Sequence, residues 1–479
     1  MDPSSILEAK DISFRFEEDG PKILDSVSLT LRKGEATMLM GPSGSGKSTL
    51  AYVLAGLYPE YAGILKGEVI CPLGKLSKLP PERRARAVSL VFQNPDDQFA
   101  MDTAGNEILF ALENINFQGD MAQRATELLT KCGLSSFFNR PVHTLSGGEK
   151  QKLSLATALA TDAELLILDE PFANVDPESA SMLLDIFKSL KDQGISFLII
   201  DHRIDFWLGM LDSVIFIDKN GRLERDRIPS DKIRESEDKF KELGLFPPGS
   251  PQWPERKISS QNKEMALAAK NLSVFLGKIP LLTNIDLSLP KGSLTAIIGR
   301  NGVGKTSLLL ALCGLMKTKG SLRLIGSSGL VFQNPSFQFL TQSVLEEVIL
   351  SLAPKTKLKG KYDPILREEA ERLLSEFSLS QHEGKSPWQL SQGEQRRLAV
   401  LTMLALDRAL LFLDEPTYAQ DEESTIQIME LLSSRVERGL TALFVTHDLS
   451  LAKAYASRVL ILEKDGLKEL EPAERWASG

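Results

Sequence analysis

The feature that most constrains the fold is a glycine-rich segment, GPSGSGKS, at residues 41–48. It fits the pattern G-x-x-x-x-G-K-[ST] at Gly41, Gly46, Lys47 and Ser48. The apolar run at 36–40 predicts a buried strand before it, and residues 48–57 predict a helix after it. This context argues against a chance glycine-rich turn. The remaining loop positions expected to contact a phosphate are Ser43, Gly44 and Thr49.

A loop of this kind binds a nucleotide phosphate by known physical means. Its glycines let backbone N–H groups surround the β-phosphate, and the helix N-terminus adds the positive end of its dipole. Lys47 can reach the β- and γ-phosphates, and the Ser48 hydroxyl can hold Mg²⁺.

The same loop occurs a second time, as GRNGVGKT at residues 299–306, after the apolar run 294–298. Its expected phosphate contacts are Gly299, Asn301, Gly302, Gly304, Lys305, Thr306 and Ser307. Three later motif residues recur at a constant spacing of 245 positions: Ser146 and Ser391, Asp169 and Asp414, His202 and His447. A constant spacing across several motifs indicates a duplicated domain.

The two copies differ in length between the glycine-rich loop and the next shared motif, VFQNP. Gly41 and Gly299 lie 258 positions apart, but Gln93 and Gln333 lie only 240 apart. The first copy is therefore longer by 18 residues in this region. Residues 58–86 are rich in proline and glycine, and we expect a turn-rich insert there.

Composition bounds the class of protein. The chain has 479 residues, with 56 Lys and Arg against 64 Asp and Glu, a net charge of −8. This balance argues mildly against a nucleic-acid partner. The N-terminal residues do not resemble a signal peptide, and no apolar run reaches the length of a membrane span. Cys71, Cys132 and Cys313 share no metal-ligand spacing, so we expect reduced thiols in a cytoplasmic protein.

Two positions each have more than one interpretation from the sequence. Phe16 lies within an alternating segment, 5–32, that predicts antiparallel strands. It can stack on a nucleotide base or face the core. Gln93 is expected to end a buried strand that begins at residue 88. It can ligate Mg²⁺, hold an attacking water or serve as a hinge.

Acidic side chains end the next predicted strand, ELLILDE, at residues 164–170. Asp169 is placed to hold Mg²⁺ through water, and Glu170 to polarise an attacking water. His202 follows the apolar run 196–200, where it can contact a γ-phosphate or be an ordinary surface histidine. The second copy repeats these candidates as Gln333, Asp414, Glu415 and His447.

The segment LSGGE at 145–149 precedes a predicted helix. Ser146 and Gly148 can form a second anion-binding helix terminus, or Ser146 can be a simple N-cap. The second copy has LSQGE, with Ser391 and Gly393. Asp176 is a candidate interface residue.

Residues 229–263 combine charged and proline-rich stretches and predict a linker with a short helix. The predicted domains are therefore residues 1–228 and 264–479.

The ordered set of glycine-rich loop, glutamine, LSGGE, acid-tipped strand and histidine resembles the ATP-binding cassette (ABC) ATPases, here twice. The resemblance implies an α/β fold in each copy. A RecA-like P-loop core would carry an antiparallel β subdomain and a helical subdomain bearing LSGGE. It also implies ATP and Mg²⁺ as ligands and head-to-tail pairing of the two domains, favoured by their single chain. Each ATP would then lie between one domain's loop and the other's signature.

A narrower resemblance is to the ATPases of energy-coupling factor importers. FQNPDDQF at 92–99 and NEILFALEN at 106–114 resemble those proteins, with a looser second copy at 332–352. A fused pair is similar to the ATPases of hydroxymethylpyrimidine/thiamine-type and cobalt-type importers. Two departures stand out. Gln392 replaces a signature glycine, and Leu276 occupies the position where family members have an aromatic that stacks on adenine, with Phe275 beside it.

The resemblance implies an importer ATPase on the cytoplasmic face of the membrane. It would power uptake of a vitamin or transition-metal ion through separate membrane subunits. The alternative is a soluble tandem-cassette factor acting on the ribosome, but such factors carry a long charged interdomain segment that this chain lacks. Sugar importers with fused ATPases are a third option, although they usually lose motif residues in one half. The transported substrate belongs to another subunit and cannot be read from this chain.

Overall fold

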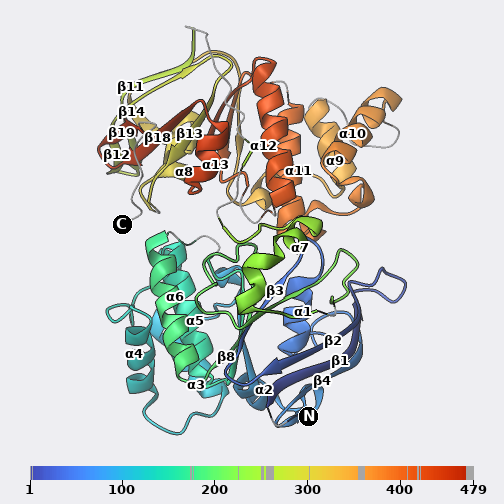
Figure 1. Ribbon diagram of the computed structural model, residues 1–479. Coiled ribbons are helices and arrows are strands. Elements are labelled where there is room, and N and C mark those ends of the chain that lie inside the picture. The colour runs from blue at the N-terminus through green and yellow to red at the C-terminus, as the bar shows by residue number, and fades with distance from the viewer. Residues whose placement is uncertain are drawn as a thin grey trace. The chain divides into compact units, whose positions relative to one another are not determined.

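The computed structural model describes residues 2, 4–172, 175, 177–224, 226–249, 253–254, 264–300, 302–353, 362–406, 408–417, 420 and 422–470. The chain divides into two compact units, one of residues up to Ser250 and one of residues from Pro251. Each unit is an α/β domain, and the two are described separately (Figure 1).

The first unit contains ten strands and seven α-helices among its described residues. The strands are β1 Ser5–Arg15, β2 Leu24–Arg32, β3 Ala36–Met40, β4 Ile64–Cys71, β5 Gly74–Lys75, β6 Val88–Val91, β7 Leu165–Asp169, β8 Ser196–Ile200, β9 Ser213–Phe216 and β10 Ile228–Pro229. The helices are α1 Lys47–Leu54, α2 Pro81–Ala87, α3 Ala104–Asn114, α4 Met121–Lys131, α5 Gly147–Ala160, α6 Pro177–Asp192 and α7 Glu237–Glu242. Short 3₁₀ turns are η1 Leu76–Lys78, η2 Pro95–Asp97, η3 Val142–Thr144 and η4 Ser230–Ser236.

The second unit repeats most of these elements. Its strands are β11 Met265–Leu276, β12 Ile279–Pro290, β13 Leu294–Ile298, β14 Lys317–Leu324, β15 Ser328–Val331, β16 Leu410–Asp414, β17 Thr441–Val445, β18 Arg458–Glu463 and β19 Gly466–Glu469. Its helices are α8 Lys305–Leu312, α9 Val344–Leu352, α10 Pro364–Glu376, α11 Gln392–Ala405, α12 Glu422–Glu437 and α13 Leu449–Tyr455. Its 3₁₀ turns are η5 Pro335–Gln338, η6 Ser380–His382 and η7 Pro387–Gln389.

A six-stranded sheet forms the core of each unit, and the strand order is the same in both. The first sheet runs β6-β7-β8-β3-β9-β10 and the second β15-β16-β17-β13-β18-β19. Five strands are parallel, and the last pairs antiparallel at the edge. The central strands β3, β7 and β8 are buried at every position, as expected for parallel strands covered on both faces. The shared order confirms the duplication inferred from motif spacing.

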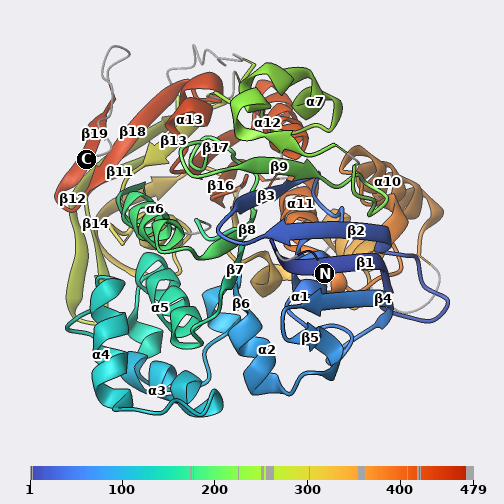
Figure 2. The same ribbon diagram turned by 60° about the horizontal axis from the view of Figure 1, so that its bottom comes forward.

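An antiparallel sheet and a helical region flank each core on opposite sides. Strands β2-β1-β4-β5 form the antiparallel sheet of the first unit, and β12-β11-β14 that of the second. Figures 1 and 2 show α3 and α4 on the opposite side of the first unit from β1, β2 and β4; in the second unit α9 and α10 lie opposite β11, β12 and β14. The two glycine-rich loops follow the central strands β3 and β13.

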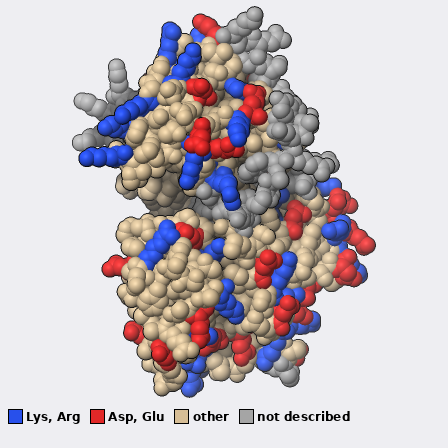
Figure 3. Space-filling view, turned by 90° about the vertical axis from the view of Figure 1, so that its left-hand side faces the viewer, with Lys and Arg blue, Asp and Glu red and all other residues tan. Residues whose placement is uncertain are grey.

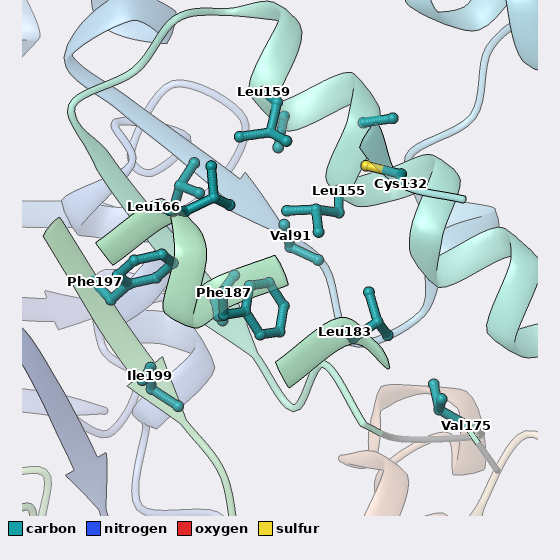
Figure 4. Close-up of a cluster of buried hydrophobic side chains, with 14 of the residues drawn as sticks. Val91, Cys132, Leu155, Leu159, Leu166, Val175, Leu183, Phe187, Phe197 and Ile199 are labelled. Atoms are coloured by element: carbon teal, nitrogen blue, oxygen red, sulfur yellow. The ribbon is translucent and has the colours of Figure 1, made fainter. Parts of the chain in front are cut away.

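The helices that begin at LSGGE and LSQGE, α5 and α11, are called the signature helices below. Buried side chains between the core sheet and its helices hold the first of them, α5, in place. Figure 4 shows Leu155 from α5, Phe187 from α6, Leu166 from β7 and Phe197 from β8 meeting in one cluster. Cys132 lies in the same cluster, and burial raises the pKa of its thiol to about 12. All three cysteines are free thiols, as expected.

The extra length of the first unit is more structured than the sequence suggested. Residues 58–86 include strands β4 and β5, turn η1 and most of helix α2 rather than a turn-rich insert. Proline and glycine misled the prediction because Pro81 lies at the first turn of α2, where proline is well tolerated. The second unit keeps a counterpart of β4, which is β14, and passes directly to β15.

The stretch predicted as a linker, 229–263, is divided between the two units. Ile233, Phe240 and Leu245 are buried in the core of the first unit. Trp253 is buried in the second, where its indole Nε1 donates to Ser450 Oγ at 3.0 Å. We therefore propose that the first domain extends to residue 249 and that the connection between domains is shorter than composition indicates.

Surface charge and helix length bear on possible partners. Lys and Arg are interspersed with Asp and Glu over the described part of the face in Figure 3, and neither sign forms a continuous field there. Within the described ranges, no helix has both the length and the apolar character needed to cross a bilayer.

Candidate functional site

The first glycine-rich loop joins β3 to α1, as the sequence predicted. Gly46 is the N-cap of α1 in the left-handed conformation, φ 92°, and no side chain caps this helix terminus among the described residues. A side chain at this position would be strained and would press on the Ile23 carbonyl. The Lys47 ammonium is buried and donates to the carbonyl oxygens of Gly41 and Pro42 at 2.8 and 2.9 Å. The lysine side chain thus bends back over its own loop, and its ammonium group lies against the loop carbonyls.

Ser48 and Asp169 meet below this loop. The Ser48 hydroxyl donates to Asp169 Oδ1 at 3.2 Å, although the two residues come from α1 and β7. Burial, and then the neighbouring Glu170, raise the pKa of Asp169 to about 7. Asp169 Oδ2 is buried without a hydrogen-bond partner among the described residues. A buried carboxylate oxygen with unused lone pairs beside a hydroxyl has the hard-donor chemistry that Mg²⁺ requires, so these residues fit that ion.

Glu170 is hydrogen-bonded by two of the predicted residues. Gln93 Nε2 donates to Glu170 Oε2 at 2.6 Å, and His202 Nε2 lies 3.0 Å from Glu170 Oε1. Burial opposes the charge on Glu170, but His202, Lys47 and these hydrogen bonds outweigh it and keep its pKa below the usual value. An ionised carboxylate held in this way can accept a proton from water.

The backbone at this glutamate is unusual in both units. Glu170 has φ 47° and Glu415 φ 50°, in the left-handed region that non-glycine residues rarely occupy. The Glu170 amide donates to the Ile200 carbonyl at 2.8 Å, and the Glu415 amide to Val445 at 3.1 Å. This conformation turns each glutamate away from its strand toward the histidine of the neighbouring strand. Such strain persists where the surrounding structure imposes it, most often at functional sites.

The second unit builds the same arrangement with small differences. Lys305 Nζ donates to the Gly299 and Arg300 carbonyls at 2.7 and 3.1 Å. The Thr306 hydroxyl donates to Asp414 Oδ2 at 2.6 Å, and burial raises the pKa of Asp414 to about 6.

The glutamate and histidine of the second unit also pair. His447 Nδ1 lies 3.1 Å from Glu415 Oε1, and the charge of Glu415 raises the pKa of His447. Burial opposes the charge on Glu415, but His447 outweighs it and lowers its pKa. The His447 side chain is 46% exposed, against 12% for His202, so the histidine of the second unit is more open to water. Gln333 is exposed in the segment after β15.

Both signature serines are helix N-caps. Ser146 Oγ accepts from the Glu149 amide, and Glu149 Oε2 accepts from the Ser146 amide, which forms a capping box at the start of α5. Ser391 and Glu394 repeat the box at α11. The N-cap interpretation is therefore correct for the local structure. Both serines are exposed, while Gly148 and Gly393 are buried beside them.

Phe16 is on the surface rather than in the core. Its side chain is 49% exposed and packs edge-on against Phe14 and Tyr58. The corresponding Leu276, at the end of β11, is 62% exposed. Phe275 faces Lys319, whose ammonium lies 5.4 Å from its ring centroid. The β11–β12 pairing has an irregularity between Val274 and Phe275, but Phe275 stays on the Lys319 side.

Two predicted residues, Asn301 and Asp176, lie outside the described residues. The other loop positions lie where predicted, at the turn before each helix or in its first turn. They are Ser43, Gly44, Thr49, Gly302, Gly304 and Ser307.

Two kinds of polar contact beside the glutamine segments occur in both units and were not predicted from the sequence. Glu107 Oε2 accepts from the amides of Ala100 and Met101, and Glu347 Oε2 from those of Leu340 and Thr341. The Ser154 hydroxyl of α5 donates to Gln98 Oε1. In the second unit, Gln338 Nε2 donates to the Ala399 carbonyl of α11. Both pairs recur at the same 240-residue spacing as Gln93 and Gln333, so the repeat itself was the signal that could have found them.

Comparison with known proteins gives the same two-part pattern. The family model described as ABC transporter matches residues 24–173 and 282–418. A Bacillus subtilis protein provisionally named an HMP/thiamine import ATP-binding protein is 34% identical, over 96% of this chain and 90% of its own. A Methanosarcina acetivorans protein provisionally named an ABC transporter ATP-binding protein is 32% identical, over 99% and 92%.

Solved structures support the fold alone. A model of ribosome-bound archaeal Pelota and ABCE1 contains a chain with a TM-score of 0.69 at 18% identity, covering 96% of this chain and 78% of that one. A structure titled RNase-L Inhibitor has a TM-score of 0.63 at 18% identity, covering 97% and 91%. The duplicated motifs, the shared core and the relatives agree: this chain belongs to the ABC transporter ATP-binding family and is an ATPase with two cassettes.

Proposed function

We propose that the chain is the ATP-hydrolysing subunit of an importer of the energy-coupling factor type. It would act at the cytoplasmic face of the membrane and power uptake of a vitamin or transition-metal ion through separate membrane subunits. The observation that carries the proposal is the 34% identity, over nearly the whole of both chains, to the protein named for HMP/thiamine import. The motifs FQNPDDQF and NEILFALEN add to it.

Each site has residues for one hydrolytic step. Lys47 and Lys305 would hold the β- and γ-phosphates of ATP once they leave their loop carbonyls. Ser48 with Asp169, and Thr306 with Asp414, would hold Mg²⁺, which supplies charge neutralisation between the phosphates when bound. Glu170 and Glu415 would accept the proton of the attacking water. His202 and His447 would orient these glutamates and contact the γ-phosphate, and Gln93 and Gln333 would hold the water or the ion.

The signature serines would complete each site from the other unit. Ser146 and Ser391 are exposed at helix N-termini, where a phosphate is favoured by backbone N–H groups and the helix dipole. We propose that Ser391 and Gly393 face the first loop and that Ser146 and Gly148 face the second. Both units are in one chain, so this pairing is intramolecular and favoured by effective concentration.

The surfaces beside the two glutamine segments differ, and this supports two unlike docking partners. In the second unit Phe337 and Leu340 are 75% and 77% exposed, and Trp388 packs edge-on against Phe339 while remaining 44% exposed. The corresponding positions in the first unit are Asp97, Ala100 and His143. An exposed apolar cluster of this kind marks a protein–protein contact.

Charge in the first docking surface rests mainly on Asp97. The neighbouring Asp96 is already paired with Lys150 of α5, whose ammonium lies 2.6 Å from Asp96 Oδ1. We therefore propose that the first surface receives a basic or polar helix of a membrane subunit and that the second receives an apolar one.

Co-purification of membrane subunits with tagged variants tests the docking. Phe337→Asp with Leu340→Asp should remove most of the copurifying membrane protein, because charges would replace two exposed apolar side chains that the docked partner would bury. Asp96→Lys with Asp97→Lys should weaken assembly through the first surface. ATP binding by the soluble chain should be unchanged in both variants.

Leu315→Asp is the matched control, because Leu315 is also an exposed apolar residue, 61% exposed, but follows α8 instead of the glutamine segment. It should copurify with membrane protein as the unmodified chain does. Equal recovery from the docking variants and the control would contradict the proposed surfaces. Recovery of ribosomal particles in place of membrane protein would favour the soluble-factor alternative.

A further inference from the structure

One buried arginine in the second unit joins three elements of its site. Arg396, in α11, is 2% exposed. Its Nη1 donates to the Phe332 carbonyl at 2.8 Å and to the Asp414 carbonyl at 3.3 Å, and its Nη2 donates to the Gln333 carbonyl. A single guanidinium thus connects the signature helix, the glutamine segment and the end of the acid-tipped strand.

Among the described residues, the first unit makes no such connection at the equivalent position. Gln151 in α5 lies 245 positions before Arg396 and is 1% exposed. Neither Gln151 Oε1 nor Nε2 has a hydrogen-bond partner in the part of the chain that the structure describes. A neutral, shorter side chain therefore stands in the first unit where the second has an arginine.

The glutamine segment of the first unit is instead joined to α5 at the surface. Lys150 pairs with Asp96, whose side chain is 57% exposed. The equivalent residues of the second unit, Gln395 and Ser336, carry no charge. Both units keep the contact through Gln98 or Gln338. The first segment is held further by the surface ion pair and by the neutral Gln93 amide, which donates to Glu170, whereas the second is held by the buried arginine.

These two connections differ in strength for physical reasons. Hydrogen bonds from a charged donor are about twice as strong as neutral ones, and a guanidinium presents them in a fixed planar geometry. A buried guanidinium that loses its acceptors is costly, so the three carbonyls and Arg396 hold one another in place. An exposed ion pair contributes little and weakens further with salt.

We propose that Arg396 is a positioning residue that locks residues 332–338 to α11 and to the end of β16, so that the second glutamine segment and signature helix move as one body. The first segment, residues 92–98, can shift relative to α5. Where the segments couple hydrolysis to membrane subunits, which rests on the function proposed above, the second unit transmits motion rigidly and the first adjusts.

Hydrogen exchange of the full-length chain without nucleotide tests the lock directly. Protection in residues 328–338 should exceed that in residues 88–98 of the same protein. Arg396→Gln, which copies the first unit, should speed exchange of 328–338 by about tenfold or more, because the loss of several charge-assisted bonds favours local opening. Arg396→Lys should speed this exchange by an intermediate factor, since lysine keeps the charge but lacks the planar guanidinium that donates from two nitrogens.

Arg397→Gln is the matched control. Arg397 is the next residue of α11 and is also buried, but its Nη1 donates to Ser424 Oγ at 3.1 Å. It should leave exchange of 328–338 unchanged. Unchanged exchange in Arg396→Gln, or equal acceleration in Arg397→Gln, would overturn the proposal. If Arg396→Gln does not fold, the same comparison is made with Arg396→Lys.

The rate of ATP hydrolysis by the second site separates this inference from the proposed function. In a Lys47→Ala background, Arg396→Gln should lower kcat and leave KM for ATP nearly unchanged, because the loop that binds phosphate is untouched. Faster exchange together with an unchanged kcat and unchanged membrane assembly would leave the lock established. That result would count against the proposed role of the glutamine segment.

Discussion

Two adjacent carboxylates in each unit have opposite acid–base character. Burial raises the pKa of Asp169 to about 7, whereas the pKa of Glu170 lies below its usual value. Asp414 and Glu415 repeat the contrast. Their environments explain it: the aspartate faces a hydroxyl at the buried end of the loop, while the glutamate faces a histidine. Pairs of titratable groups with diverging pKa values are typical of sites where one group binds and the other moves a proton.

The first prediction is that both cassettes hydrolyse ATP through this glutamate. Glu170→Gln and Glu415→Gln should each lower the rate at their own site by roughly 100-fold or more, because glutamine keeps the size but loses the base. Single-turnover hydrolysis, with the other site disabled at its loop lysine, measures each effect. A variant with an undiminished rate would mean that its site does not use the glutamate as a base.

The second prediction is that the first site binds ATP more tightly than the second. Phe16 presents an exposed aromatic ring, whereas Leu276 presents only an aliphatic side chain. Base–aromatic stacking contributes about 1–3 kcal/mol, which corresponds to a roughly 5- to 150-fold difference in affinity. Apolar contact from leucine should bring the difference toward the lower end.

ATP titration of Lys305→Ala and Lys47→Ala, each leaving one site, measures the two affinities. Leu276→Tyr should reduce the difference in ATP affinity between the two sites. Phe275 cannot replace the missing ring where it stands, because it packs beneath Lys319. Equal affinities that do not respond to Leu276→Tyr would show that stacking does not govern the second site.

At the scale of single elements, α5 and α11 begin with the same Ser–Glu capping box, but the glutamates of the two boxes have different ion-pair partners. Glu149 pairs with Arg140 at 3.2 Å, and both side chains are partly exposed. Glu394 pairs with His382 at 2.8 Å, and both side chains are largely enclosed. Burial opposes the charge on Glu394, but the hydrogen bonds from His382 and Ser391 outweigh it and lower its pKa to about 2.

The third prediction follows from that lowered pKa. Because the folded value lies below the unfolded value near 4.5, the stabilisation is fully present above that pH and is lost as the pH falls toward 2. Glu394→Gln should therefore lower the unfolding free energy of the second unit by about 2–3 kcal/mol at pH 7. The difference in unfolding free energy between the variant and the unmodified chain should shrink below pH 4.5. Thermal unfolding from pH 8 to pH 3.5 measures it.

Glu149→Gln is the comparison for this experiment. Its partly exposed ion pair should contribute only about 0–1 kcal/mol, so the same replacement should destabilise the first unit less. A gap for Glu394→Gln that stays constant, or widens, as the pH falls below 4.5 would contradict the account of this cap.

Much of the architecture could be predicted from the sequence, because parallel buried strands read as continuous apolar runs. Strands β3 and β8 have the predicted bounds, and Glu170 and His202 were expected to share one site. The insert at 58–86 was missed because proline and glycine mark turns and helix starts equally well. Residues 229–249 were assigned to a linker because most of them are charged or polar, and only a few, such as Phe240, are buried in the core.

Other features of the site cannot be seen in a sequence pattern. The exchange of Gln151 for Arg396 is one of several differences between two similar segments, and only the burial and partners of these residues reveal the contrast. The pairing of Asp96 with Lys150 joins residues 54 positions apart, so neither charge could be assigned a partner beforehand. The positive φ of Glu170 likewise depends on β8 beside it.

At the scale of the whole molecule, one duplicated fold carries two unlike surfaces. The core sheets share their strand order, and both loops, acid pairs and signature caps are retained. The positions beside the glutamine segments have diverged, with Asp97 and His143 in one unit and Phe337 and Trp388 in the other. Both units keep these residues, and we propose that the differences beside the glutamine segments match each unit to a different part of an asymmetric membrane complex.

Flotation of a gently prepared cell lysate on a density gradient tests the proposed function most directly. The chain should float with membrane vesicles, remain in a complex with integral membrane proteins after mild detergent, and leave that complex in the Phe337→Asp, Leu340→Asp variant but not in Leu315→Asp. Sedimentation with ribosomal subunits, with none of the chain in the membrane fraction, would contradict an importer ATPase and favour a soluble factor of translation.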